Sequence, residues 1–307
     1  MVIQARSQSQ HGYRLAPNRP ASFTMFNTCH IGTYRRTLIL TILMFPFILR
    51  QPHTRVDVTL LTALRSRFVH PLPPLAGLLS LEVGVLVLFG WAVNSTDLKS
   101  LAPGLIPMMP NAAIAFVCMG ISLLAASART HRQYVRFMAG GAAAVAAIIG
   151  LATCLEYLLM VDLGFDQWVL FEPLETVGSS IPGRMGINTA ICFLIVGLAL
   201  ALKILAPGRL EAMSDGFSLG ATFLAFLAFL GYLYQERFLY GVGPYTPMAL
   251  HTALTLMLVG AGALALEPAK GFMAVINSRQ AGGYMLRRML PVVFVILPAI
   301  GWIQLYV

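Results

Sequence analysis

The chain contains long apolar runs separated by short polar segments, and this pattern leaves few folds open to it. A membrane-spanning helix needs about 20 mostly apolar residues. Runs of about this length cover residues 74–94, 106–127, 137–160, 185–205, 216–235, 246–266 and 289–307. Because 58% of the residues are hydrophobic and 11% are charged, the chain has too little polar surface for a soluble globule. We predict an all-α polytopic bundle of about seven transmembrane helices.

Basic residues are concentrated in alternate segments between these runs. They are Arg50, Arg55, Arg65, Arg67, Arg129, Arg132, Arg136, Lys203, Arg209, Lys270, Arg279, Arg287 and Arg288. The positive-inside rule places such segments in the cytoplasm, so we expect residues 50–73 inside and the C-terminus outside. The net charge of +9 therefore indicates orientation in a lipid bilayer. No nucleic-acid-binding motif is visible, and no nucleic-acid partner is expected.

The first 73 residues differ from the rest. Residues 1–35 are polar and rich in Ser, Gln, Arg and Pro, which predicts disorder. Residues 36–73 hold the short apolar stretch TLILTILMFPFIL, which falls well short of a hydrocarbon core about 30 Å thick. We interpret it as an interfacial helix followed by a basic cytoplasmic linker. Alternatively, the natural start lies further downstream and the stretch is incidental. The membrane domain is expected over residues 74–307.

One pattern occurs at three places in the membrane domain, and it reads Met-x-x-(Asn/His)-(Ala/Thr)-Ala-x6-Gly. Its members are Met108, Asn111, Ala112, Ala113 and Gly120, then Met185, Asn188, Thr189, Ala190 and Gly197, then Met248, His251, Thr252, Ala253 and Gly260. Another apolar run precedes each copy, so the predicted repeat is a helix pair. The repeat units are about 74–127, 137–205 and 216–266, with 289–307 as a final helix. All three cross the membrane in the same sense.

Helical geometry divides the motif residues between two faces. At about 100° per residue, positions seven apart share a face and positions nine apart point in opposite directions. Small residues let helices approach closely. We therefore assign Ala113, Gly120, Ala190, Gly197, Ala253 and Gly260 to helix packing. If the pairs surround an axis, the polar residues Asn111, Asn188 and His251 are expected to converge near the outer membrane surface.

These polar residues form the candidate ligand-binding site. Its predicted members are Met108, Asn111, Glu156, Met185, Asn188, Met248 and His251. One alternative is that each Asn or His only bonds a neighbouring helix, which is worth about 0.6 kcal/mol on average in membranes. Another is a copper site, since thioether and imidazole groups bind copper. Asparagine is a poor soft-metal ligand, however, so neither a metal nor a cofactor is expected.

Other residues in the predicted helices have further interpretations. Glu82 and Glu156 are acidic residues within apolar runs, where a carboxylate is costly and indicates a function. The aromatic residues Trp91, Tyr157, Tyr232 and Tyr234 fit an interfacial aromatic belt. The loop over 162–184 is interpreted as a lid. The cysteines, most of them inside predicted helices, fit small apolar fillers. Since no nucleophile and base pattern is present, we do not expect an enzyme.

The motifs LAPGLIPMMPNAAIAF, IPGRMGINTAICFLIVGLAL and YGVGPYTPMALHTALTLMLVGAGAL resemble a known family. This family is the multi-helix N-terminal membrane domain of bacterial PAS-containing histidine kinases and GGDEF diguanylate cyclases. The resemblance covers about residues 74–307. It implies a sensory input domain in the bacterial inner membrane, with Met108, Asn111, Met185, Asn188, Met248 and His251 at the family-like positions.

The resemblance also implies a departure. Members of the family usually add an eighth helix followed by PAS and kinase or cyclase domains, whereas this sequence ends at Val307. The functional hypothesis is therefore a non-enzymatic sensory or ligand-binding domain whose output comes from a protein partner, a homo-oligomer or a separate downstream segment. The alternatives are a stand-alone membrane subunit of a larger complex and a carrier of small solutes or metals.

Overall fold

The computed structural model describes residues 70–102, 104–128, 132–164, 183–241, 245–278 and 280–306. These residues belong to one compact unit, Thr54–Val307. Within the described ranges, every regular element is a helix. The predictions for residues 1–35, for nearly all of 36–73 and for most of the 162–184 loop fall outside them.

The main helices follow the apolar runs of the sequence. They are α3 (Leu72–Ala92), α5 (Pro110–Ser127), α6 (Gln133–Leu159), α7 (Ile187–Leu205), α8 (Glu211–Tyr234) and α10 (Leu250–Ala265). Short helices α4 (Thr96–Ser100), α9 (Arg237–Tyr240) and α11 (Gly271–Asn277) lie in the connections. The last part of the chain forms α12 (Ala281–Pro291), the π-helical turn η2 (Val292–Ile296) and α13 (Leu297–Tyr306).

Six helices in the described part of the chain are long and apolar enough to cross a membrane: α3, α5, α6, α7, α8 and the continuous stretch Ala281–Ile303. This supports the predicted multi-pass helical membrane bundle. The expected span 246–266 is shorter than predicted, because α10 has 16 residues. At about 1.5 Å per residue it is about 24 Å long, less than a typical hydrocarbon core. Seven spans therefore remain a prediction.

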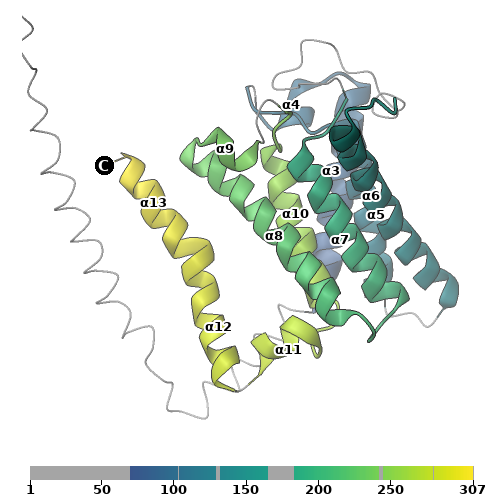
Figure 1. Cartoon of the computed structure of the whole chain (residues 1–307), viewed down its shortest axis with the longest axis vertical. Helices are drawn as coiled ribbons and strands as arrows, with labels where there is room; N and C mark the ends of the chain where they lie inside the picture. Colours follow the sequence, from purple (N-terminus) through teal and green to yellow (C-terminus); the bar gives the residue numbers. More distant parts are fainter. Residues whose placement is uncertain are drawn as a thin grey trace, which may run out of the picture. The chain divides into compact units, whose positions relative to one another are not determined.

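The main helices run alongside one another (Figure 1), and their contacts close into a ring. Each contacts the next in the order α3, α5, α6, α7, α8 and α10, and α10 contacts α3 again. Helices α5, α7 and α10 also contact one another. Over the most apolar part of each helix, 56% of residues are buried in α5 and α7, against 33% in α3, α6 and α8. In α10, 11 of the 16 residues are buried. Helices α5, α7 and α10 therefore form the inner part of the ring, and α3, α6 and α8 form the outer part.

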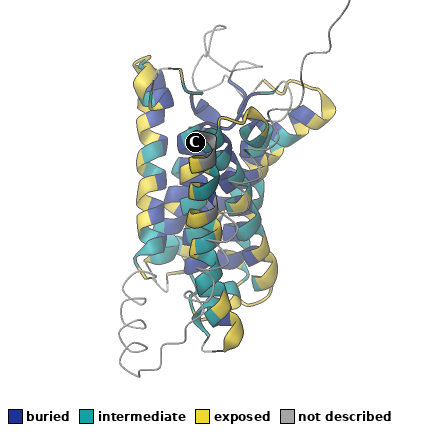
Figure 2. Cartoon of the chain, turned by 90° about the vertical axis from the view of Figure 1, so that its left-hand side faces the viewer, coloured by how far each residue is buried: buried dark blue, intermediate teal, exposed yellow. Residues whose placement is uncertain are grey.

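Buried residues gather between the helices, and the outward faces are exposed (Figure 2). Phe116 of α5 and Phe193 of α7 are completely buried and meet edge to face, with ring centroids 4.8 Å apart.

Helices α5, α7 and α10 begin at the end of the bundle where α3, α6 and α8 finish. We call this end the motif end, and the opposite end the basic end.

The final helical stretch runs beside α8 and has few buried residues. The rings of Phe226 and Phe294 lie 4.6 Å apart, and the Tyr234 hydroxyl donates to the Pro298 carbonyl at 3.3 Å. Pro291 lies inside α12, directly before the π-helical turn. Proline cannot donate the usual main-chain hydrogen bond, which explains why the regular helix is interrupted there.

Candidate functional site

At the motif end, the segments that enter α5, α7 and α10 have the same backbone geometry. The residues that precede the helices, Met109, Gly186 and Ala249, have φ and ψ of −70° and 151°, −62° and 149°, and −69° and 151°. Met108, Met185 and Met248 come one residue earlier and are each 1% exposed. They lie before the helices, although the apolar runs of the sequence predict all three to be helical.

An aromatic side chain from the preceding main helix donates a hydrogen bond to the main chain of each of these methionines. Trp91 Nε1 donates to the Met108 carbonyl at 2.8 Å. Tyr157 and Tyr232 donate through their hydroxyls to the carbonyls of Met185 at 3.0 Å and Met248 at 2.8 Å. We call these three hydrogen bonds the aromatic clamps. They give three members of the predicted aromatic belt a specific structural role.

Each clamp residue lies one or two residues before the end of its helix, at the same spacing from a residue with left-handed backbone. Three residues later comes a left-handed non-glycine residue: Asn94 with φ 53°, Met160 with φ 54° and Gln235 with φ 59°. Such a residue at the C-terminus turns the chain out of the helix. A cation or a ring also covers each clamp: Lys99 lies 4.2 Å from the Trp91 ring, Arg184 5.7 Å from Tyr157, and Tyr240 stacks on Tyr232 at 4.2 Å.

The predicted polar residues occupy the second position of each inner helix. Asn111 and His251 are buried, at 5% and 6% exposure, whereas Asn188 is partly exposed. Asn111 Oδ1 accepts a hydrogen bond from the Ala112 amide at 2.7 Å. Neither ring nitrogen of His251 has a hydrogen-bond partner among the described residues. His251 is therefore the polar member of the predicted site whose hydrogen-bonding capacity is unused within the described structure.

Glycines show which way these residues face. A Cβ on Gly120, Gly197 or Gly260 would collide with α3, α6 or α8 respectively, which is the preceding main helix in each case. Asn111, Asn188 and His251 lie nine residues earlier, on the opposite side of their helices. Each therefore faces the next pair around the ring. This geometry distributes the three polar residues over three interfaces, so it does not favour one shared pocket on the axis.

Gly262 locates His251 more closely. Eleven residues separate the two, which is about 20° more than three full helical turns, so they share a face of α10. A Cβ on Gly262 would lie 2.7 Å from the Ala76 Cβ and 3.6 Å from Leu123 Cδ1. His251 therefore lies on the side of α10 that packs against α3 and α5. Helices α3 and α10 are antiparallel. The eleven residues from Gly262 back to His251 therefore correspond to eleven residues forward along α3 from Ala76, so Val87 lies at the level of His251.

The other predicted packing residues are also at close helix contacts. Ala113, Ala190 and Ala253 are completely buried. A Cβ on Gly84 would lie 2.7 Å from the Ala113 carbonyl oxygen, and one on Gly150 would lie 2.6 Å from that of Ala190. Small residues on both partners therefore allow α3 to approach α5, and α6 to approach α7, at backbone distance.

Glu156 belongs to an ion-pair cluster that is found in one helix pair. It is 1% exposed, and its Oε1 accepts from the Leu163 amide at 2.9 Å and lies 3.2 Å from Arg184 Nη2. Arg184 also contacts Asp162 at 3.1 Å. In the other pairs the residue before the clamp is Gly90 or Gly231, where a Cβ would meet the Cβ of Leu98 at 2.5 Å or of Leu239 at 2.8 Å. Glu156 is thus linked to the segment before Met185.

The described part of the site does not include a histidine, cysteine and carboxylate cluster of the kind that binds zinc or iron. Among the described residues, no group of three or more His, Cys, Asp or Glu side chains is placed to hold a metal ion. Cys118, Cys154 and Cys192 are free thiols.

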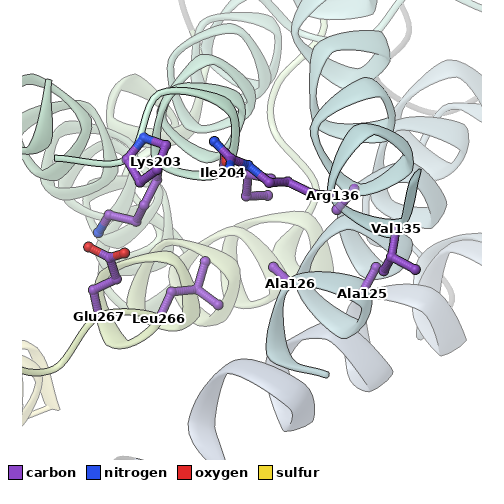
Figure 3. A pocket seen from close by; sticks show the side chains of 10 residues that line it. Ala125, Ala126, Val135, Arg136, Lys203, Ile204, Leu266 and Glu267 are labelled. Carbon is purple, nitrogen blue, oxygen red and sulfur yellow. The ribbon is translucent and has the colours of Figure 1, made fainter. Parts of the chain in front are cut away.

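Sequence reasoning missed a cavity at the basic end (Figure 3). Its volume is about 260 Å³, and it lies among the last turns of α5, α7 and α10 and the first turn of α6. It is lined by Ala125, Ala126, Val135, Arg136, Ala139, Lys203, Ile204, Pro207, Leu266 and Glu267. Arg136 donates to the carbonyls of Ile204 at 2.6 Å and Leu205 at 2.8 Å, which caps the C-terminus of α7.

Lys203 connects this cavity to a buried ion pair. Its Nζ lies 2.7 Å from Asp215 Oδ1 and 3.0 Å from the Ala263 carbonyl oxygen. Asp215 Oδ2 accepts from the Phe272 amide at 2.6 Å, so the pair joins α7, α8, α10 and α11. At the rim, Lys270 contacts Glu211 and Glu267, both at 3.1 Å. The hydrogen bond to Glu211, with that to Glu267, raises the pKa of Lys270.

Comparison with known proteins gives no further guide to the site. The chain matches no protein-family model, no curated protein and no solved structure. The resemblance to the membrane domains of histidine kinases and diguanylate cyclases therefore remains a prediction from the motifs.

Proposed function

We propose that the chain is a membrane-embedded sensory, ligand-binding input domain of a bacterial signalling protein, without a catalytic role of its own. In this proposal the pairs α3 with α5, α6 with α7, and α8 with α10 are copies of one repeat unit, and the final helix is the seventh span. The motif end lies outside the inner membrane, in agreement with the positive-inside rule.

The aromatic clamps support the repeat. In each pair, the motif glycine of the inner helix packs against a main-chain carbonyl of the outer helix. These carbonyls belong to Gly77, Ala143 and Ser218. The clamp residue of the same outer helix, Trp91, Tyr157 or Tyr232, follows 14 residues later. The left-handed residue follows three positions later in every case. Agreement at these positions, despite different side chains, is expected of copies of one unit.

His251 carries the proposal of ligand binding. A neutral imidazole has one donor and one acceptor nitrogen, and leaving a buried polar group unsatisfied costs about 1–3 kcal/mol. Buried polar groups without a partner are rare in folded proteins and need an explanation. A small molecule that offers both a donor and an acceptor, bound beside His251 between α10 and the α3 and α5 pair, would satisfy both nitrogens.

The test is to identify what the protein retains when it is purified from native membranes. We expect mass spectrometry of organic extracts to find a small molecule enriched with the wild type and lost with His251→Leu. His251→Asn restores the residue type of the other two units and should retain part of it. If His251→Leu and wild type carry the same compounds, or none, the ligand site is wrong. Recovery of a stoichiometric membrane protein would instead support the subunit alternative.

A further inference from the structure

Glu82 is an acidic residue on the outer surface of a membrane-spanning helix. It lies ten residues from each end of α3, which places it about 15 Å from both. The structure leaves it exposed, with no hydrogen bond or ion pair to any described residue. In contrast, Glu156, Lys203 and Asp215 are buried and ion-paired. Glu82 is thus the charged residue of the described spans that faces outward at mid-membrane.

The residues around Glu82 form a regular seam. The steps between them alternate between four and three residues, which is the spacing of a heptad interface. The seam consists of Leu75, Leu79, Glu82, Leu86, Phe89 and Val93. Its apolar members are between 43% and 58% exposed. The opposite face of α3 carries Gly77 and Gly84, which contact α5, so the seam points away from the ring.

Hydrocarbon cannot hydrogen-bond a carboxyl group, so a lipid-facing acid at mid-membrane is unfavourable. A carboxylic acid in its neutral form has both an O–H donor and a carbonyl acceptor. It is therefore complementary to a second copy of itself. The described Lys and Arg side chains do not offer an equally suitable partner. Most of them lie at or near helix ends. Arg287 and Arg288 lie further inside the final stretch, where Arg287 donates to the Ser278 carbonyl at 2.9 Å and Arg288 lies 4.4 Å from the Tyr284 ring. A partner with the same seam satisfies the acid and covers the apolar residues at once.

We propose that the α3 seam is the interface with a second copy of this chain, in which the two Glu82 side chains hydrogen-bond each other. The two copies are related by a twofold axis in the interface, because the same residues meet on both sides. The apolar residues pack as knobs into holes, and the polar pair fixes the register. The seam lies on the outward face of α3, whereas His251 packs against the side of α3 that faces α10, and the proposed interface does not depend on ligand binding at His251.

Disulfide cross-linking of the full chain in membranes tests the interface. In a background with Cys29, Cys118, Cys154 and Cys192 replaced, we expect Leu79→Cys to give a covalent dimer on mild oxidation. The matched control is Ile148→Cys on α6, which is 62% exposed but outside the seam, and it should stay monomeric. A monomeric Leu79→Cys, or equal cross-linking of both variants, would overturn the proposal. If another segment of the same chain covered the seam, Leu79→Cys would also stay monomeric.

Substitution of Glu82 tests the hydrogen bond. We expect Glu82→Leu to weaken dimerisation about five- to tenfold, since two reciprocal hydrogen bonds are lost, measured by energy transfer between labelled copies diluted in micelles. Glu82→Gln keeps a donor and an acceptor and should stay within about threefold of wild type. Because residue 82 is on the surface, thermal stability of the monomer should not fall in either variant. Equal dimerisation of Glu82→Leu and wild type would refute the role of Glu82.

Discussion

Removing one hydroxyl group from an aromatic clamp should destabilise the bundle by a measurable amount. Tyr157→Phe deletes the donor that lies 3.0 Å from the Met185 carbonyl. Tyr157 and Met185 are 5% and 1% exposed, so water has little access to the carbonyl. A hydrogen bond in a membrane protein contributes about 0.6 kcal/mol on average, and an unsatisfied buried group costs about 1–3 kcal/mol. We therefore expect a loss of about 1–2 kcal/mol.

The assay is reversible unfolding by SDS in mixed micelles, followed by circular dichroism at constant protein concentration. Tyr232→Phe should behave like Tyr157→Phe, because its hydroxyl lies 2.8 Å from the Met248 carbonyl. Tyr134→Phe is the control, since that side chain is 56% exposed and its hydroxyl receives a hydrogen bond from Arg132 at the surface. The reasoning is refuted if both clamp variants unfold at the same SDS fraction as the control.

Two further predictions use the same unfolding assay. Gly197→Val should lower the free energy of unfolding by about 3 kcal/mol or more, because its Cβ would lie 2.8 Å from the Ala147 amide nitrogen and force α6 and α7 apart. The control is Gly141→Val, which has open space around it and should change that free energy by less than about 0.5 kcal/mol. Asp215→Leu should cost about 3–5 kcal/mol by leaving Lys203 buried without its partner. Adding Lys203→Met should recover most of that loss, and an equally unstable double variant would contradict the explanation.

The sequence was sufficient to predict a helical membrane bundle but not the length of every span. Apolar runs mark which residues avoid water, and they do not distinguish a helical residue from an extended one. Residues 246–249 belong to such a run, yet they are extended and enter α10 only at Leu250. The sequence signal for this boundary was the proline before each motif, Pro247 in this copy. Proline favours an extended residue before it and the first turn of a helix after it.

The aromatic clamps could not be found from spacing alone. Trp91 is 17 residues from Met108, Tyr157 is 28 from Met185, and Tyr232 is 16 from Met248. The connecting segments differ in length, so only the fold brings each donor to its carbonyl. Helical periodicity likewise gave the angle between Asn111 and Gly120, but it could not say which helix each would face. That information comes from the order of helices around the ring.

The three helix pairs share a backbone arrangement but carry different side chains at two positions. These positions are the second residue of the inner helix and the residue before the clamp. The second residue of the inner helix is Asn111, Asn188 or His251, and only His251 has a side chain with two buried polar atoms that lack a hydrogen-bond partner among the described residues. Similarly, glycine precedes two of the clamps, and Glu156 precedes the third. The aromatic clamps keep the main chain in place regardless of these changes. If the proposed function is right, His251 is therefore the position at which substitution should alter ligand recognition more than stability, whereas replacing Glu156 should also lower stability, because it removes a carboxylate that lies 3.2 Å from the buried Arg184 guanidinium.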